Sequence, residues 1–374
     1  MITKDLLDFF RSQNDMFVGL LKQFVSMRTY SGEVDGINLF MDEIQGMFKD
    51  FCFDMTRIPT DNGDILSLSF FPEKNEMVVW LAHADTVQVG ESFPSVKIEN
   101  DRFYGNGSFD MKNGIALFYF ALKAFHELEV ESNKQVRLIF TPDEEIGSKG
   151  SREFLSRACR GAKAVLLPEP CCPNGGIKTR RKGIATVRAR CAGRAAHSGI
   201  EPEKGKDANR GLVCLLNHID AVLQDFPDVS FNPGLLSGGV RVNIVSPESR
   251  FEGELRSFSN DSLKKALDVI QGIRRVGDVD VNISVEMCHP ALEFDEKNQR
   301  LYGIAKKIAE EMDYDLPSCE SGGGSDGSDL SDEGIPVIDG LGMRGGGAHS
   351  AEEYVELSDF PYRAALIARL TQEI

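Results

Sequence analysis

The feature that most constrains the fold is a change of rhythm along the chain. From residue 1 to about residue 180, short apolar runs alternate with helical patterns. This alternation predicts strands at 76–82, 135–140 and 162–167 and helices at 114–129 and 151–160. Such an alternation is typical of an α/β sheet whose active site lies at the carboxyl ends of the strands.

A second rhythm begins at about Gly183 and has the order β-α-β-β-α-β of a split ferredoxin-like unit. Its expected strands are 186–191, 240–245, 251–258 and 279–287, and its expected helices are 208–226 and 262–275. A helix at 298–312 and an apolar strand at 336–341 then return to the first pattern. Because 374 residues exceed what one core usually serves, we predict a first domain from 1–182 and 290–374, with a small domain inserted at 183–289.

Composition excludes several classes of protein. With 41% hydrophobic and 27% charged residues and no low-complexity tract, the chain is expected to fold. Its formal net charge of −16 repels phosphate backbones, which argues against a nucleic-acid partner. The longest apolar runs, such as 114–122, are too short to span a membrane, so no membrane partner is expected.

The N-terminus and the cysteines indicate the compartment. Acidic residues interrupt the first ten positions, where a secretory signal needs an unbroken apolar stretch, so we expect a cytoplasmic protein. The eight cysteines are scattered without C-x-x-C spacing, although Cys171 and Cys172 are adjacent. This distribution fits reduced, mostly buried thiols.

Potential metal ligands stand at strand ends and in loops, in five separate places. The first is His83, which directly follows an apolar strand and precedes Asp85 by two residues. A carboxylate in that position can orient a metal-binding imidazole. The alternative is a strand-end histidine with an ordinary hydrogen bond.

The second and third places are carboxylates, one in a turn and the others after a strand. Asp110 lies in the glycine-rich turn before the predicted helix, where it is either an N-cap or a bridge between two cations. Asp143, Glu144 and Glu145 follow the next strand, and three adjacent carboxylates would repel one another unless cations or a shared proton relieve them. The simplest assignment of roles to these carboxylates is one metal ligand and one general base.

Glu169 at another strand end and His349 in a glycine-flanked loop complete the set. Two Zn²⁺ ions would contribute a charge of +4, and Asp110, Glu145, Glu169 and a bridging hydroxide would contribute −4. The centre would then be electroneutral. The nitrogen and oxygen ligands suit zinc, and Co²⁺ or Mn²⁺ could substitute. Two such ions would activate a shared water and polarise a scissile carbonyl. His126 and His218 lie within helical patterns and are expected to be structural.

The strings LAHADTV, GNGSFDMKNG, TPDEEIGS, LLPEP and RGGGAHSAEEYVEL occur in this order. Together they resemble the co-catalytic zinc metallopeptidases that include glutamate carboxypeptidase of the carboxypeptidase G type, aminoacylase, peptidase T and succinyl-diaminopimelate desuccinylase. The resemblance runs from about Val78 to the C-terminus. It implies a zinc-exopeptidase-like catalytic domain with an inserted ferredoxin-like lid and dimerisation domain.

The resemblance also implies roles for these residues. His83, Asp110 and Glu169 would hold one zinc ion, and Asp110, Glu145 and His349 would hold the other. Glu144 would be the general base on a metal-bridging water, and Asp85 the orienting carboxylate. A cis peptide bond is expected between Asp110 and Met111.

The inserted domain carries further matches to this family. His197 resembles the lid histidine that reaches the neighbouring subunit's active site, which implies a homodimer through the lid. Asn243 and Arg256 resemble the residues that hold the substrate's carbonyl and carboxylate; a solvent-exposed strand is the alternative for each. Beyond the inserted domain, Gly324 and Ser325 lie in a stretch that resembles the family's glycine-rich GGSD or GGTD turn, which implies that backbone N–H groups there receive a substrate carboxylate.

We therefore predict a two-zinc hydrolase that cleaves an amide bond of a small peptide or an N-acyl amino acid with a free carboxylate, in the manner of a carboxypeptidase. An aminoacylase, a dipeptidase or another amidohydrolase of the same family is the alternative. A non-catalytic binding or regulatory protein on this scaffold is a third possibility, whose expected mark would be a missing ligand or base. The basic run from Lys178 to Lys182 has two interpretations: a solvated hinge, or attraction of an anionic substrate.

Overall fold

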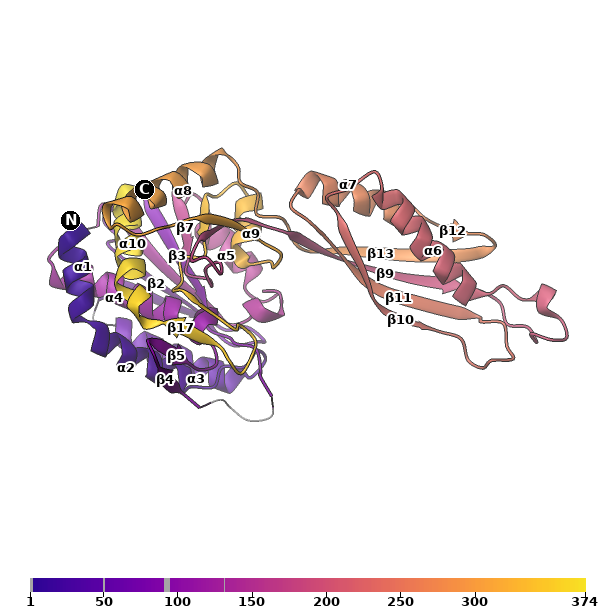
Figure 1. The fold of residues 1–374 in the computed structure, drawn as a ribbon, viewed down its shortest axis with the longest axis horizontal. Coiled ribbons are helices and arrows are strands. Elements are labelled where there is room, and N and C mark those ends of the chain that lie inside the picture. The colour runs from indigo at the N-terminus through magenta and orange to yellow at the C-terminus, as the bar shows by residue number, and fades with distance from the viewer. Residues whose placement is uncertain (1–2, 50, 91–94, 131) are drawn as a thin grey trace. The chain divides into compact units, whose positions relative to one another are not determined.

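The structure is a computed structural model that describes residues 3–49, 51–90, 95–130 and 132–374. The chain forms two compact units (Figure 1). Unit 1 comprises Met1–Thr179, Phe294–Ser321 and Ser325–Ile374, and unit 2 comprises Arg180–Glu293 and Gly322–Gly324. Each unit has its own hydrophobic core.

A mixed eight-stranded sheet forms the centre of unit 1, in the order β1-β2-β6-β3-β7-β15-β8-β14. Its strands are β1 (Asp54–Ile58), β2 (Ile65–Phe70), β3 (Met77–His83), β6 (Gln135–Thr141), β7 (Ala164–Leu167), β8 (Ile177–Arg181), β14 (Ser318–Ser321) and β15 (Val337–Asp339). Strands β6, β3, β7 and β15 are parallel to one another and almost fully buried, as expected where helices cover both faces. The four strands predicted in this region are confirmed, and their ends differ by at most two residues.

The helices of unit 1 cover this sheet (Figure 1). They are α1 (Thr3–Ser12), α2 (Asn14–Val25), α3 (Val34–Phe48), α4 (Asn113–Glu127), α5 (Arg152–Cys159), α8 (Glu296–Glu311), α9 (Asp326–Asp332) and α10 (Phe360–Glu373). Trp80 of β3 is fully buried and stacks on Phe118 of α4, with ring centroids 5.0 Å apart. Replacing such an aromatic residue by alanine costs about 3–5 kcal/mol. The strand that leads to His83 is therefore firmly held.

No helix in the described part of the chain is both long enough and apolar enough to cross a membrane.

A second, smaller sheet in unit 1 has the order β16-β17-β5-β4. Its strands are β4 (Lys97–Glu99), β5 (Arg102–Tyr104), β16 (Gly345–Gly346) and β17 (Tyr354–Glu356). Pairing of β17 with β5 brings Tyr354 opposite Tyr104, so the loop that carries His349 lies beside the segment that leads to Asp110.

Unit 2 contains an antiparallel five-stranded sheet in the order β10-β11-β9-β13-β12. Its elements are β9 (Gly183–Ala192), α6 (Ala208–Leu223), β10 (Ser230–Gly238), β11 (Glu248–Ser257), α7 (Asn260–Gln271), β12 (Arg275–Val276) and β13 (Val279–His289). Alternate residues of β9 are buried, and both helices lie on one face of the sheet (Figure 1). Asp207 and Ser259 accept hydrogen bonds from backbone N–H groups at the starts of α6 and α7, which stabilises both helix N-termini.

The predicted strand at 240–245 is wrong. The strand that pairs with β11 is β10, which ends at Gly238, and residues 240–245 form a turn. Val240 and Val242 are exposed, so the apolar alternation that suggested a strand reflects no buried face. Only Ile244 makes a bridge, with His197.

The prediction that all cysteines are reduced is also wrong for one pair. Cys172 and Cys319 form a disulfide, with Cα atoms 6.5 Å apart, which lies in the usual range. The two residues are 147 positions apart in sequence. Cys172 follows β7 and Cys319 lies in β14, and both strands belong to the same sheet. Sequence spacing does not reveal this proximity. Cys159, Cys171 and Cys191 are free and buried as expected.

Candidate metal centre

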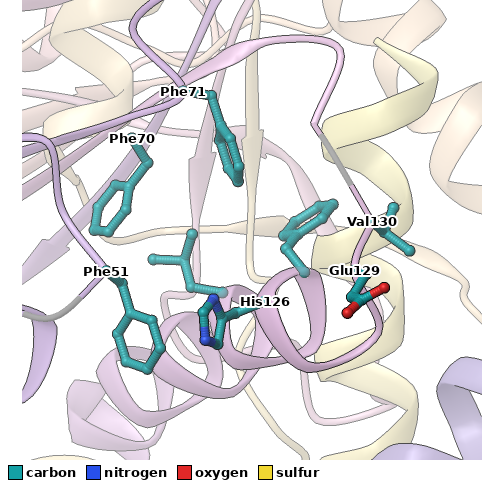
Figure 2. Close-up of a pocket in the computed structure, with 8 residues that line it drawn as sticks. Phe51, Phe70, Phe71, His126, Glu129 and Val130 are labelled. Carbon is teal, nitrogen blue, oxygen red and sulfur yellow. The ribbon is translucent and has the colours of Figure 1, made fainter.

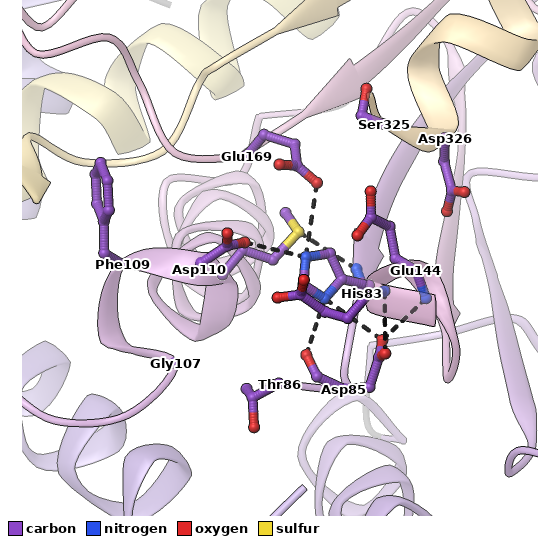
Figure 3. A network of polar contacts seen from close by, with 12 residues as sticks. His83, Asp85, Thr86, Gly107, Phe109, Asp110, Glu144, Glu169, Ser325 and Asp326 are labelled. Atoms are coloured by element: carbon purple, nitrogen blue, oxygen red, sulfur yellow. Dashed lines mark hydrogen bonds and ion pairs between the residues drawn. The ribbon is translucent and has the colours of Figure 1, made fainter. Parts of the chain in front are cut away.

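His83 stands at the carboxyl end of β3, where parallel strands of the sheet end, and its side chain is only 2% exposed. Its Nδ1 atom lies 2.9 Å from the backbone oxygen of Asp85 and 3.5 Å from the Asp85 carboxylate. Its Nε2 atom faces two other carboxylates, 3.2 Å from Asp110 and 3.6 Å from Glu169 (Figure 3). The ring is thus oriented by Asp85 on one side and presents Nε2 to a cluster of oxygen atoms on the other.

Electrostatics at His83 favour positive charge. Burial alone would lower the pKa of this imidazole, but hydrogen bonds to Asp110 and Asp85 and the charges of Glu144 and Glu169 raise it well above its usual value. A cluster that stabilises positive charge on a buried group is suited to a cation.

Asp110 lies in an irregular turn, Ser108–Lys112, which precedes α4. The peptide bond between Asp110 and Met111 is cis, as the resemblance implied. Its two carboxylate oxygens point to different histidines: Oδ1 lies 3.2 Å from His83 and Oδ2 lies 3.5 Å from Nε2 of His349. Asp110 therefore has the arrangement of a carboxylate that can bridge two cations.

Glu144 and Glu145 form a short turn, Glu144–Ile146, after β6. The backbone N–H groups of both glutamates donate to the two carboxylate oxygens of Asp85, at 3.1 and 3.2 Å. Asp85 therefore fixes this turn as well as the ring of His83. Burial, followed by the charge of Glu169, raises the pKa of Glu144 well above its usual value.

Glu169 and His349 reach the cluster from loops. Glu169 follows β7 between two prolines and is buried. His349 lies in the loop between β16 and β17 with a φ of 61°, and its Nε2 atom is 3.1 Å from the Glu145 carboxylate. Hydrogen bonds to Asp110 and Glu145 raise the pKa of His349 to about 10.

The ligand atoms fall into two groups that share Asp110. One group is His83, Asp110 and Glu169, the other is Asp110, Glu145 and His349, and the ligand atoms of each lie within 4.8 Å of one another. Ligands about 2.0–2.2 Å from a tetrahedral zinc ion lie roughly 3.3–3.6 Å apart. The separations of 3.1–3.6 Å between these histidines and carboxylates fit that geometry. The residues present thus fit two metal ions that share one carboxylate.

Glu353 holds the Asp110 turn, and the sequence analysis missed it. It is 2% exposed, and its carboxylate accepts hydrogen bonds from the backbone N–H groups of Gly107, Phe109 and Asp110 at 2.7–2.8 Å. Burial raises the pKa of Glu353 to about 7, although these three N–H donors lower it. The only available signal was its place in the string AHSAEEYVEL, which does not separate it from exposed Glu352.

Lys112 holds the other side of the same turn. Its fully buried Nζ atom donates to the carbonyl oxygens of Phe24 and Met27 at the end of α2, at 3.1 and 2.6 Å. The turn that carries Asp110 is thus tied both to the N-terminal helices and to β17.

The sequence profile of Peptidase family M20/M25/M40 matches residues 79–373, which include all five candidate ligands. The chain belongs to this family. Its members are metal-dependent peptidases and amidohydrolases, and this M20 chain is such an enzyme.

Known M20 proteins resemble the chain over nearly its whole length. Carboxypeptidase G2 of Pseudomonas sp. (strain RS-16) is 28% identical over 371 residues, which cover 95% of this chain and 88% of that protein. Aminopeptidase PepT of Bacillus cereus has the same fold, with a TM-score of 0.79, 21% identity and coverage of 96% and 98% of the two chains. The YXEP protein of Bacillus subtilis, described as a dinuclear metal binding peptidase, gives a TM-score of 0.71 at 15% identity, with coverage of 97% and 98%. M20 peptidases are dinuclear metal enzymes, in keeping with the paired ligand groups.

The residues predicted to bind substrate lie mainly in unit 2 of the M20 chain. His197 and Asn243 are exposed and lie on adjacent segments, where the N–H of Ser198 donates to the carbonyl of Asn243 at 3.1 Å. Arg256 of β11 is paired with Glu254 at 2.6 Å and also donates to the carbonyl of Gly322.

The glycine-rich turn is divided between the units. Gly324 belongs to unit 2, whereas Ser325 belongs to unit 1, where its buried hydroxyl donates to Asp339 at 2.8 Å. The hydroxyl of Ser325 is therefore engaged in holding the turn.

Another pocket, of about 370 Å³, lies elsewhere in unit 1 (Figure 2). It is lined by four phenylalanines, among them Phe51 and Phe71, and by His126. The ring of His126 packs edge-on against Phe51, with centroids 5.3 Å apart, which agrees with its expected structural role. No predicted site residue lines this pocket.

Proposed function

We propose that the protein is a two-zinc hydrolase that cleaves an amide bond of a small peptide or an N-acyl amino acid, in the manner of a carboxypeptidase. The observation that carries this proposal is the position of the Asp110 carboxylate, because one of its oxygens faces His83 and the other faces His349. Each histidine also faces one further carboxylate, Glu169 or Glu145. Co²⁺ or Mn²⁺ would suit the same ligands.

Two bound metal ions would polarise the scissile carbonyl and lower the pKa of the attacking water. Side chains of the protein would carry out the proton transfers. Glu144 lies beside the ligand Glu145 but is absent from both ligand groups, which leaves its carboxylate to accept a proton from the water and to return it to the leaving amine. Asp85 keeps this carboxylate in place through the backbone of the turn.

We assign the substrate's free carboxylate to the region of Arg256, Asn243 and the turn at Gly324 and Ser325. The guanidinium of Arg256 suits this task because its planar fork binds carboxylates in bidentate fashion. Its contact with the carbonyl of Gly322 supports a shared site with the turn.

For the remaining architecture we propose a catalytic domain from residues 1–182 and 290–374 and an inserted ferredoxin-like lid at 183–289. We also propose that the lid mediates a homodimer in which His197 stabilises the oxyanion in the partner's site. The exposed apolar side chains of Leu235 and Leu236 in unit 2 support such an association. An aminoacylase, dipeptidase or other amidohydrolase activity is the alternative within the same chemistry.

The test is hydrolysis of a panel of N-acyl amino acids and dipeptides before and after dialysis against a chelator. We expect the chelator to abolish hydrolysis and two equivalents of zinc per chain to restore it, with Co²⁺ and Mn²⁺ as parallel additions. A chain that binds two equivalents of zinc and hydrolyses no member of the panel would instead be a binding or regulatory protein.

A further inference from the structure

Buried carboxylates hold the segment between β6 and α5, which carries both glutamates of the candidate centre. Asp143 directly precedes these glutamates and is fully buried. Its carboxylate accepts hydrogen bonds from the backbone N–H of Gly150 at 2.7 Å and from the hydroxyl of Ser151 at 2.6 Å. Asp143 therefore fixes the end of the segment that leads into α5, and it leaves the other two adjacent carboxylates to the chemistry.

A second buried carboxylate reaches the same segment from a distant part of the chain. Asp326 is the first residue of α9 and is only 3% exposed. Its Oδ1 atom accepts a hydrogen bond from the hydroxyl of Ser148, and its Oδ2 atom accepts one from the hydroxyl of Thr141 at 3.4 Å. Thr141 ends β6 and Ser148 follows the turn of Glu144, so the two donors stand before and after this glutamate in the chain. Figure 3 shows the carboxylates of Asp85 and Asp326 on opposite sides of Glu144.

The backbone of Ser148 has a conformation that needs such support. Its φ is 53°, and the φ of the preceding Gly147 is 90°. Glycine adopts this left-handed region freely, whereas serine does so only at a cost in free energy. The backbone N–H of Ser148 donates to the carbonyl of Asp143 at 2.8 Å, and its hydroxyl donates to Asp326. These two hydrogen bonds hold the turn after the glutamates in one conformation.

The residue before Asp326 fixes the start of α9. The buried hydroxyl of Ser325 donates to Asp339 at 2.8 Å, and Asp339 ends β15, one of the parallel strands of the central sheet. Asp326 is therefore held by the sheet and not by the segment that it supports. Asp85 holds the same segment in another way, because it accepts directly from two backbone N–H groups of the turn.

We propose that Asp326 is a positioning residue for the general base Glu144. Through the hydroxyls of Thr141 and Ser148, it fixes the segment in the conformation in which Glu144 faces the attacking water. This inference rests on the proposed function. Asp326 is in neither ligand group, and a bound ion would itself hold Glu145, so loss of Asp326 should misplace the base and leave the metal bound. A base must lie within hydrogen-bond reach of its proton, and a displacement of about 1 Å can cost about 10²-fold in rate.

Two variants remove the same hydrogen bond from opposite sides. Asp326→Ala is expected to lower kcat about 10- to 100-fold for a substrate that the wild type hydrolyses, with unchanged KM and zinc affinity. Ser148→Ala keeps the carboxylate and should lower kcat about 10-fold. Because both variants break one bond, the double variant should be no slower than Asp326→Ala alone. Asp332→Ala, exposed at the end of the same helix, is the matched control and should keep the wild-type kcat.

A second measurement does not depend on turnover. Hydrogen exchange of the backbone amides in residues 142–148 of the metal-free protein should be faster in Asp326→Ala and Ser148→Ala than in the wild type and the control. Asp326→Asn keeps one acceptor oxygen, so it should recover part of the kcat that Asp326→Ala loses. Thermal unfolding establishes that each variant is folded, and Ser148→Ala tests the inference if Asp326→Ala does not fold.

The possible failures are distinguishable. A normal kcat in both Asp326→Ala and Ser148→Ala would overturn this inference and leave the proposed function standing. A loss of zinc affinity equal to the loss of kcat would also overturn it, because Asp326 would then support the metal centre and not the base. Additive losses in the double variant would have the same meaning for the hydrogen bond to Ser148. A wild-type chain that binds two zinc equivalents and hydrolyses no member of the panel would overturn the proposed function and this inference with it.

Discussion

The two groups of predicted site residues differ in how the chain holds them. The candidate ligands of unit 1 stand at strand ends, in a turn and in a loop, and several of them are held by further hydrogen bonds: His83 contacts the backbone oxygen of Asp85, and the backbone N–H groups of Asp110 and Glu145 donate to Glu353 and Asp85. In unit 2, His197 and Asn243 are exposed and are related only through backbone contacts. If these residues have the proposed roles, the groups of unit 1 are positioned before substrate binds, whereas His197 and Asn243 of unit 2 would gain side-chain partners on binding. Changes in unit 1 should therefore alter kcat and metal affinity, and changes in unit 2 should alter KM.

The largest expected effect is that of Glu144→Gln. Removal of the general base should lower kcat by about 10²- to 10⁴-fold, while the zinc content stays the same because Glu144 is absent from both ligand groups. Steady-state kinetics and metal analysis of the same preparation measure both quantities. Glu153→Gln, on the exposed side of α5, is the control. Near-normal turnover of Glu144→Gln would refute the assignment of the base.

The next effect concerns the support of the ligands. Glu353→Gln leaves an amide with one acceptor oxygen opposite three backbone N–H donors, so the Asp110 turn should loosen and zinc affinity should fall by about 10- to 100-fold. Competition with a chromophoric chelator measures this affinity. Glu352→Gln is the neighbouring exposed control and should bind zinc normally. Equal affinities in both variants would show that the turn is held without Glu353.

A smaller effect, on KM and not on zinc affinity, is expected in unit 2. Arg256→Ala should raise KM for a substrate with a free carboxylate by about tenfold, because a hydrogen-bonded ion pair is lost, and zinc affinity should not change. Arg250→Ala on the same strand, where the arginine pairs with Glu248 at 2.7 Å, is the matched control. Weaker zinc binding in Arg256→Ala would contradict the proposed division between the units.

The smallest effect is expected for Val242→Ser. Val242 is fully exposed, so the free energy of unfolding should change by less than about 0.5 kcal/mol. By contrast, Val187→Ala in the buried face of β9 should destabilise the protein by about 2 kcal/mol. Urea unfolding measures both. A loss above about 1 kcal/mol for Val242→Ser would contradict the exposed position of this turn.

Much of unit 1 was predictable because its signals are local. The apolar runs of β3, β6, β7 and β15 are short and nearly continuous, and their burial follows directly from that pattern. The candidate ligands could be found because each stands next to such a run or in a glycine-rich loop. Their assignment as zinc ligands stays a prediction, but their convergence on Asp110 follows from the parallel order of the strands.

The features that were missed depend on distant partners. Glu352 and Glu353 are adjacent and chemically identical, yet only Glu353 is buried, where its carboxylate accepts hydrogen bonds from the distant Asp110 turn. The apolar alternation around Val242 resembles a strand, but β11 already pairs with β10 and β9 on its two sides. Composition and spacing contain no information about such contacts.

The hydrogen bonds from the Asp110 turn to Glu353 also bear on biosynthesis. The two residues are 243 positions apart, so a ribosome that adds 5–20 residues per second would reach Glu353 roughly 10–50 seconds after Asp110. For the later part of that interval the nascent chain contains His83, Asp110, Glu145 and Glu169 without the residue that positions the turn. His349 is made only just before Glu353. Metal binding by the group of Asp110, Glu145 and His349 is therefore expected only after this late segment has been synthesised.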